Sequence, residues 1–207
     1  MMVVFRRYRR DTGGATSVEF GLVGGLFMVM MLGAAEFALA YWQWNAAAKA
    51  VQVGARLAAV SDPVDNTLKS ITGLDVADPG DPMPPYDDIV CRGAEQACNG
   101  DTGRYDSAAM EAIVYGPGNA GCAQDSQGYP TMCRIFPRIG TENLVVSYVH
   151  TGLGFAGRPG GPVPTITVEL RDVEYDWILL DRLFDADRIL MPGFRTSVTG
   201  EDLTFNW

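Results

Sequence analysis

The sequence predicts an α+β protein in which a long N-terminal membrane-spanning helix continues into a small antiparallel-sheet domain with disulfides. Three observations support this fold class. Residues 20–35 form an uncharged apolar run. Residues 143–150 and 165–173 alternate between apolar and polar side chains with a period of two, as half-buried strands do. All four cysteines follow the apolar run, and none lies before or within it.

Length and charge limit the function classes. The chain has 207 residues and a formal net charge of −9, enough for one membrane helix and one modest domain. Residues 1–14 hold four arginines and one aspartate, so a chain without them carries a formal charge of −12. An acidic surface of this kind repels phosphate backbones, and we therefore expect no nucleic-acid partner.

The apolar run predicts a single transmembrane helix. Sixteen uncharged residues span only about 24 Å of the ~30 Å hydrocarbon core, so the span must extend from about Val18 to about Trp42. Tyr41, Trp42 and Trp44 then form an aromatic belt at the far end. The arginine cluster at residues 6–10 fixes the N-terminus in the cytoplasm by the positive-inside rule.

The helix is expected to continue beyond the membrane and to form one element over residues 15–61. Residues 46–60 are rich in helix formers with an apolar stripe, and Ser61, Asp62 and Pro63 end it. Two pairs of small residues suit close helix packing in a membrane, although such pairs are also common by chance: Gly21 with Gly25, and Ala34 with Ala38. Glu36 either reaches the outer interface or meets a partner helix, and the sequence leaves both open.

Residues 62–90 are predicted to form a linker or an irregular loop, because four prolines between residues 79 and 85 prevent regular structure. The aspartates of this segment lack the spacing of a calcium loop, so solvated acids are favoured over a metal site.

The domain at 91–207 contains the cysteines. Their spacing does not resemble the close pairs of zinc or redox sites, and an even number on one side of a membrane favours disulfides. Of three possible connectivities we favour the sequential one, with Cys91 bonded to Cys98 and Cys122 bonded to Cys133.

Further elements are expected in this domain. A short helix at 107–115 begins near Asp106 or Ser107 and stops at Gly116. The strands at 143–150 and 165–173 should form an antiparallel hairpin across a glycine- and proline-rich turn. Residues 177–190 suit a short helix or a packed loop, and residues 194–198 a further strand, with 203–207 as an optional extension.

No catalytic constellation is apparent, and we expect the chain not to be an enzyme. The one histidine, His150, ends a predicted strand without a nucleophile motif beside it, so a structural role is favoured. The serine-hydrolase, zinc-protease and phosphate-loop motifs are missing. We therefore predict no cofactor and no metal.

The junction at Gly14 and Ala15 carries the most specific signal. Glu19 and Phe20 follow it at the start of the apolar run, and the arginines precede it. This arrangement resembles the class III signal of type IV pilins and pseudopilins. Further short motifs occur in order, at residues 33–37, 45–48 and 54–59. Together they resemble the TadE-like family of the tight-adherence (Flp-type IVb) pilus machinery over about residues 9–62.

The resemblance implies a processed protein. A prepilin peptidase would cut after Gly14 and remove the cytoplasmic leader 1–14, so that Ala15 becomes the N-terminus and Glu19 its fifth residue. Glu19 would then pair with the freed amino group of Ala15 on a neighbouring subunit, or be a simple interfacial acid near the helix dipole. The implied partners are the peptidase, other pilin or pseudopilin subunits and pilus-assembly membrane proteins.

The implied location is the bacterial inner membrane, with the C-terminal domain in the periplasm or carried into an extracellular pilus. The large domain indicates a minor component rather than a major pilin. Two alternatives remain: an unprocessed single-pass protein with a periplasmic binding or sensing domain, and a type II secretion pseudopilin.

Overall fold

The computed structural model describes residues 14–116, 122, 130–177 and 189–200 of the 207. The chain divides into two compact units. Residues 1–42 and 176–187 form the first, and residues 43–175 and 188–207 form the second.

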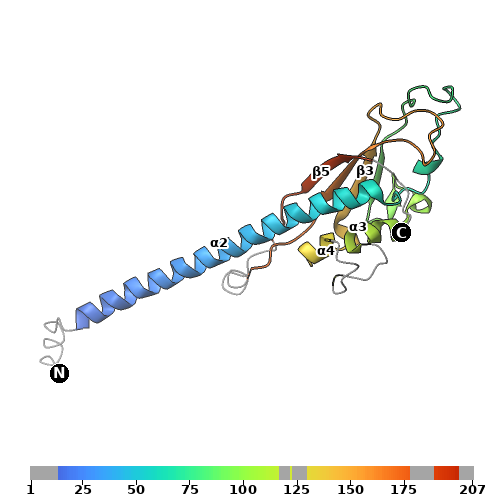
Figure 1. Cartoon of the computed structure of the whole chain (residues 1–207). Coiled ribbons are helices and arrows are strands. Elements are labelled where there is room, and N and C mark those ends of the chain that lie inside the picture. Colours follow the sequence, from blue (N-terminus) through green and yellow to red (C-terminus); the bar gives the residue numbers. More distant parts are fainter. Residues whose placement is uncertain (1–13, 117–121, 123–129, 178–188, 201–207) are drawn as a thin grey trace, which may run out of the picture. The chain divides into compact units, whose positions relative to one another are not determined.

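Helix α2 (Ala15–Val60) is the longest described element and matches the predicted helix within two residues at either end. Figure 1 draws α2 as one uninterrupted helix, and the large apolar residues of its part in the first unit are exposed. It is long and apolar enough to cross a membrane, and it is the one such helix among the described residues. A long apolar N-terminal helix was predicted, and this part of the fold is confirmed.

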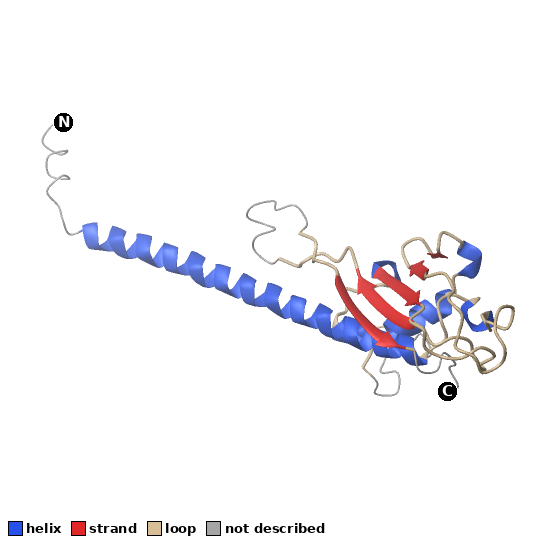
Figure 2. Ribbon diagram, turned by 90° about the horizontal axis from the view of Figure 1, so that it is seen from above, coloured by secondary structure: helices blue, strands red, loops and turns tan. Residues whose placement is uncertain are grey.

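The second unit contains one five-stranded antiparallel sheet in the order β2-β1-β3-β4-β5 (Figure 2). Its strands are β1 (Ile89–Arg92), β2 (Ala97–Cys98), β3 (Leu144–Val149), β4 (Thr165–Leu170) and β5 (Phe194–Thr199). The predicted hairpin is confirmed, since β3 and β4 pair from Leu144 opposite Leu170 to Val149 opposite Thr165. The α+β class is therefore confirmed.

Strand β4 ends three residues earlier than predicted. Asp172 has a φ of 55°, in the left-handed region, and this conformation cannot continue a strand. The two strands β1 and β2 were not predicted at all. They form a tight hairpin in a glycine-rich stretch, and Cys91 lies directly opposite Cys98 in their register.

The core lies between the second half of α2 and one face of the sheet. Ala47, Ala50 and Val51 on the helix belong to the same buried cluster as Val146 and Val168 on the sheet. Trp44 packs edge-on against Phe194 of β5, with ring centroids 4.7 Å apart. The stripe predicted at 46–60 thus packs on the chain's own domain.

Two short helices flank the core. Helix α3 (Ser107–Tyr115) has the predicted bounds, and the Asp106 carboxylate caps it by accepting hydrogen bonds from the N–H groups of Ala108 and Ala109. Helix α4 (Met132–Ile135) was not predicted. The structure pairs Cys91 with Cys98 and Cys122 with Cys133, the favoured sequential connectivity, with Cα atoms 4.0 and 5.2 Å apart.

The segment predicted as a linker or irregular loop is largely irregular, and part of it packs into the domain. It contains the 3-10 helix η2 (Leu68–Ser70), and Val64, Leu68 and Met83 are buried. The Val64 N–H donates a hydrogen bond to the hydroxyl oxygen of the fully buried Tyr148, at 2.9 Å. Prolines exclude a regular ladder, but they do not prevent isolated apolar side chains from entering a core formed by distant residues.

Three expectations lie outside the described residues. These are the arginine cluster at 6–10, most of the apolar segment at 177–190, and the optional strand extension at 203–207.

Candidate functional site

The predicted processing site lies at the start of α2. Gly14 is exposed in a turn of 3-10 helix, and α2 begins at Ala15. Glu19 is exposed one turn later, and the Phe20 side chain is 79% exposed. Gly14, Glu19 and Phe20 thus lie exposed within the first two turns at the start of α2.

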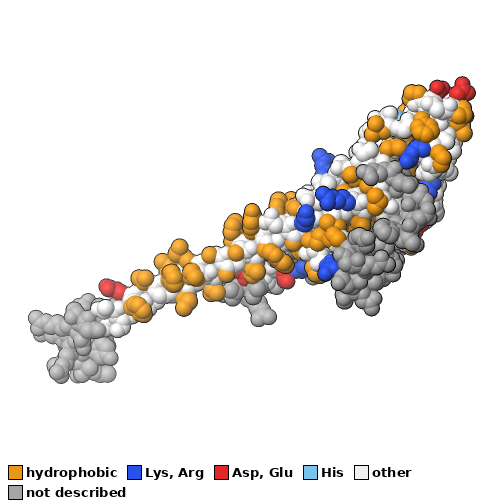
Figure 3. All heavy atoms as spheres, viewed as in Figure 1, with side chains coloured by type: hydrophobic (Ala, Val, Ile, Leu, Met, Phe, Trp, Pro, Cys, Tyr) orange, Lys and Arg blue, Asp and Glu red, His pale blue; other side chains and the backbone are white. Residues whose placement is uncertain are grey.

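The helix after this point has an apolar surface on every side. From Leu22 to Leu32, the large apolar side chains are between 46% and 70% exposed. A water-soluble protein rarely exposes a contiguous apolar surface of this length. In Figure 3 the apolar side chains run along the helix. This surface is chemically suited to lipid or to other apolar helices.

The small residues on this surface have open space around them. A Cβ atom added at Gly21 or Gly25 would have no heavy atom within 4 Å, apart from the helix's own backbone. Ala34 and Ala38 are exposed as well. Within the described residues these positions have no packing partner, so any close contact they serve would be with another molecule.

Glu36 behaves differently from its neighbours. Its side chain is only 3% exposed, whereas Phe37 next to it is 73% exposed. The chain itself covers this carboxylate, an arrangement that neither sequence alternative anticipated.

Gly54, in the part of α2 that packs on the domain, has a specific steric role. A Cβ atom added there would lie 2.3 Å from the sulfur of Met132, on α4. The Met132 side chain occupies the space that a Cβ atom at position 54 would fill, so a larger residue there requires this side chain to move. The same motif that contributed to the family resemblance therefore has a local packing reason.

The one histidine of the chain packs against an aromatic ring. The His150 ring packs edge-on against Tyr86, with centroids 5.0 Å apart. The His150 Nδ1 and the Tyr86 hydroxyl are both buried, and neither has a hydrogen-bond partner among the described residues. Burial, with the nearby Asp88 carboxylate, raises the pKa of Tyr86 to about 12, so its hydroxyl stays protonated at neutral pH.

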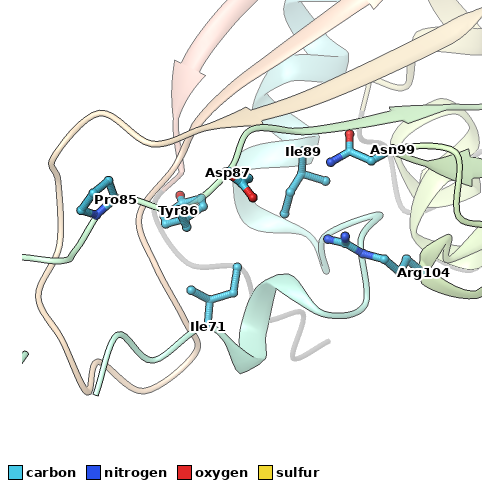
Figure 4. A pocket seen from close by; sticks show the side chains of 7 residues that line it. All are labelled: Ile71, Pro85, Tyr86, Asp87, Ile89, Asn99 and Arg104. Carbon is cyan, nitrogen blue, oxygen red and sulfur yellow. The ribbon is translucent and has the colours of Figure 1, made fainter. Parts of the chain in front are cut away.

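One cavity, of about 410 Å³, lies beside Tyr86 (Figure 4). Its lining is half apolar and half polar: Ile71, Pro85, Tyr86, Asp87, Ile89, Asn99 and Arg104. The Arg104 Nη2 atom lies 2.7 Å from the Asp65 Oδ2 atom without the geometry of a hydrogen bond, and Asp65 is fully buried. The pair is thus an ion-pair contact that anchors Arg104 at the cavity. Sequence patterns gave no signal for this cavity, because its residues come from separate segments.

The described residues contain one cluster with metal-ligand atoms, and its chemistry does not suit a metal. Asp65, Cys91 and Cys98 place their ligand atoms within 4.8 Å of one another. The two cysteines are bonded to each other, so they offer no thiolate. The Asp65 Oδ1 atom already accepts hydrogen bonds from the Thr67 N–H and hydroxyl, at 2.8 and 2.5 Å.

Comparisons with known proteins bear on the N-terminal helix. A search of curated proteins and a search of solved structures gave no match. The family model described as TadE-like protein matches residues 14–56, which is less than a quarter of the chain. The resemblance predicted from the sequence is therefore confirmed for the segment that runs from Gly14 to Arg56.

Proposed function

We propose that this protein is a TadE-like pseudopilin or minor pilin that acts in the assembly of a Flp-type, tight-adherence pilus. The observation that carries the proposal is the apolar, outward-facing first half of α2, which begins at Ala15 and presents Glu19 one turn later. This segment lies inside the TadE-like match. The chain has no catalytic step of its own in this proposal and is instead the substrate of a prepilin peptidase.

The orientation follows from charge and cysteine content. The arginines at 6–10 hold the N-terminus in the cytoplasm, and α2 anchors the chain in the inner membrane. The second unit then lies in the periplasm, an oxidising compartment in which disulfides such as Cys91–Cys98 persist.

Glu19 acquires its role only after the cut. Cleavage between Gly14 and Ala15 creates an α-amino group at the start of the apolar helix. When two such helices lie side by side in a low-dielectric environment, the Glu19 carboxylate of one compensates the ammonium of the other. The small residues Gly21 and Gly25 allow that close approach.

Mass spectrometry of the mature protein tests the cut. The expected N-terminal residue is Ala15, and a Gly14→Leu variant should retain the leader and fail to support pili. Detection of Met1 or Met2 at the N-terminus of the mature protein would support the unprocessed alternative instead.

A second variant separates processing from assembly. Glu19→Gln keeps the size and hydrogen-bonding capacity of the side chain but removes its charge. We expect the leader to be removed normally and piliation to fall. If pili are unaffected by both variants while type II secretion is lost, the chain is a secretion pseudopilin rather than a pilus component.

A further inference from the structure

Two loops far apart in the sequence form one platform beyond the ends of the inner strands β3 and β4. Loop 72–84 precedes β1, and loop 151–161 joins β3 to β4 (Figure 1). Four backbone hydrogen bonds join them: Gly80 N to Ala156 O at 3.0 Å, Met83 N to Gly154 O at 3.3 Å, Ala156 N to Asp81 O at 2.8 Å, and Gly157 N to Thr72 O at 2.8 Å. The platform is therefore a paired structure rather than two independent loops.

The platform has a buried layer of its own. Met83 and Ala156 are 4% and 1% exposed. Gly157 has a φ of 77°, and a Cβ atom added there would lie 3.3 Å from Leu74 Cδ2. Leu74 thus lies against the backbone of the other loop.

Large apolar side chains nevertheless point outward from this platform. Leu74, Val76, Leu153 and Phe155, named here the loop patch, are 47%, 80%, 45% and 46% exposed. Met83 and Ala156 form the buried layer of the platform, and each of these four residues stays at least 45% exposed, although Leu74 also lies against Gly157. Exposed apolar side chains on a preorganised backbone are typical of a protein-binding surface, because little conformational entropy is lost on docking.

The charges around the loop patch limit what can bind there. Loop 72–84 carries three exposed aspartates, Asp75, Asp78 and Asp81, and two more, Asp87 and Asp88, follow it just before β1. Loop 151–161 carries one basic residue, the half-buried Arg158. Figure 3 shows acidic and apolar side chains gathered together over these loops. The aspartates repel anionic lipid headgroups, and they also repel the same patch on a second copy of the chain.

We infer that the loop patch docks a protein partner whose contact surface carries apolar side chains flanked by lysine or arginine. The apolar side chains would supply the desolvated centre of the interface, and the aspartates its complementary rim. The inference is independent of the proposed cleavage, because every residue that carries it lies in the second unit.

Site-specific photo-crosslinking in living cells tests this inference on the full chain. A benzoyl-phenylalanine placed at Val76 should crosslink to a protein, and mass spectrometry should map the attachment to a peptide with apolar residues next to Lys or Arg. The double substitution Asp75→Asn and Asp78→Asn should lower the yield of this crosslink by roughly threefold or more. Both substitutions keep the side-chain size and leave the buried layer intact.

Val60 provides the matched control, since it is also an exposed valine, 40% exposed, at the end of α2. A crosslinker at Val60 should give products whose yield does not respond to the two aspartate substitutions. Crosslinks from Val76 to lipid, to a second copy of this chain, or to nothing would overturn the inference. So would a protein crosslink that is insensitive to the aspartate substitutions. An uncleaved leader with a charge-dependent Val76 crosslink would instead contradict only the proposed function.

Discussion

The two halves of α2 use similar residues in opposite ways. In residues 15–42 the large apolar side chains are exposed around the helix, whereas in residues 43–60 the apolar side chains form a buried stripe on the domain. The first half is uniformly apolar, and the second is amphipathic with Lys49, Gln52 and Arg56 outward. A helix that is apolar on every side is available for contacts with other molecules. A helix with a single apolar stripe packs that stripe within its own chain. Mutations should therefore act on assembly in the first half and on stability in the domain.

The largest stability effect is expected from the buried ion pair of the domain. Arg104→Met leaves the fully buried Asp65 carboxylate without its cation, and we expect a loss of about 3 kcal/mol in the free energy of unfolding. Urea denaturation of the full chain in detergent, followed by tryptophan fluorescence, measures this loss. The control is Lys69→Met, which removes a pair to Asp62 whose side chains are 35% and 47% exposed, so that at most about 1 kcal/mol is lost. Equal losses would contradict the role of burial.

An intermediate change in the free energy of unfolding is expected when two glycines of α2 are replaced by alanine. At Gly54 an added methyl group would collide with Met132, and Gly54→Ala should cost about 1–3 kcal/mol through overpacking. At Gly25 the space around an added methyl group is open, and Gly25→Ala should leave the monomer unchanged or more stable by about 0.5–1 kcal/mol. The same denaturation measurement applies to both.

Piliation should respond to these two substitutions in the opposite order from stability, with the larger effect at Gly25. If Gly25 serves a helix contact between molecules, Gly25→Ala lowers piliation without lowering stability. The comparison between the two halves fails if Gly25→Ala destabilises the domain, or if Gly54→Ala leaves it unaffected.

Local sequence signals predicted those features that depend on neighbours in the chain. Helix α3 has its expected bounds because the Asp106 cap and the Gly116 stop are both adjacent to it. Helix α2 and the β3-β4 hairpin follow from composition and periodicity. The processing-site residues also lie within one short stretch, which is why they could be proposed without a structure.

Features that depend on distant residues were missed. Strand β1 has only four residues, and it is held by pairing with β3, whose residues lie more than fifty positions later. The burial of Val64 depends in part on the hydroxyl of Tyr148, 84 residues away. The loop patch likewise exists only because two loops meet in the folded chain. No pattern within a window of ten or twenty residues contains that information.

The smallest effect concerns two half-buried tyrosines of the domain and appears only at high pH. Burial raises the pKa of both Tyr86 and Tyr105 from 10.0 to about 12. The Asp88 carboxylate adds to this rise at Tyr86, and the Glu111 and Asp106 carboxylates add to it at Tyr105. Because the folded pKa lies above the unfolded value, this contribution to stability is fully present below pH 10. It is lost as the pH rises from 10 through 12, by roughly 1 kcal/mol for each ring after allowance for solvent exposure.

A titration of tyrosinate absorbance can assign this step. Tyr86→Phe should remove one tyrosinate from the absorbance change near pH 12 and none from the change near pH 10. Circular dichroism over the same range then separates the two halves of the molecule. The tertiary signal of the domain should weaken above pH 10, while the helical signal of residues 15–42 in detergent persists, because that segment depends on apolar contacts that pH does not change. Simultaneous loss of both signals would show that the two halves are not energetically separate.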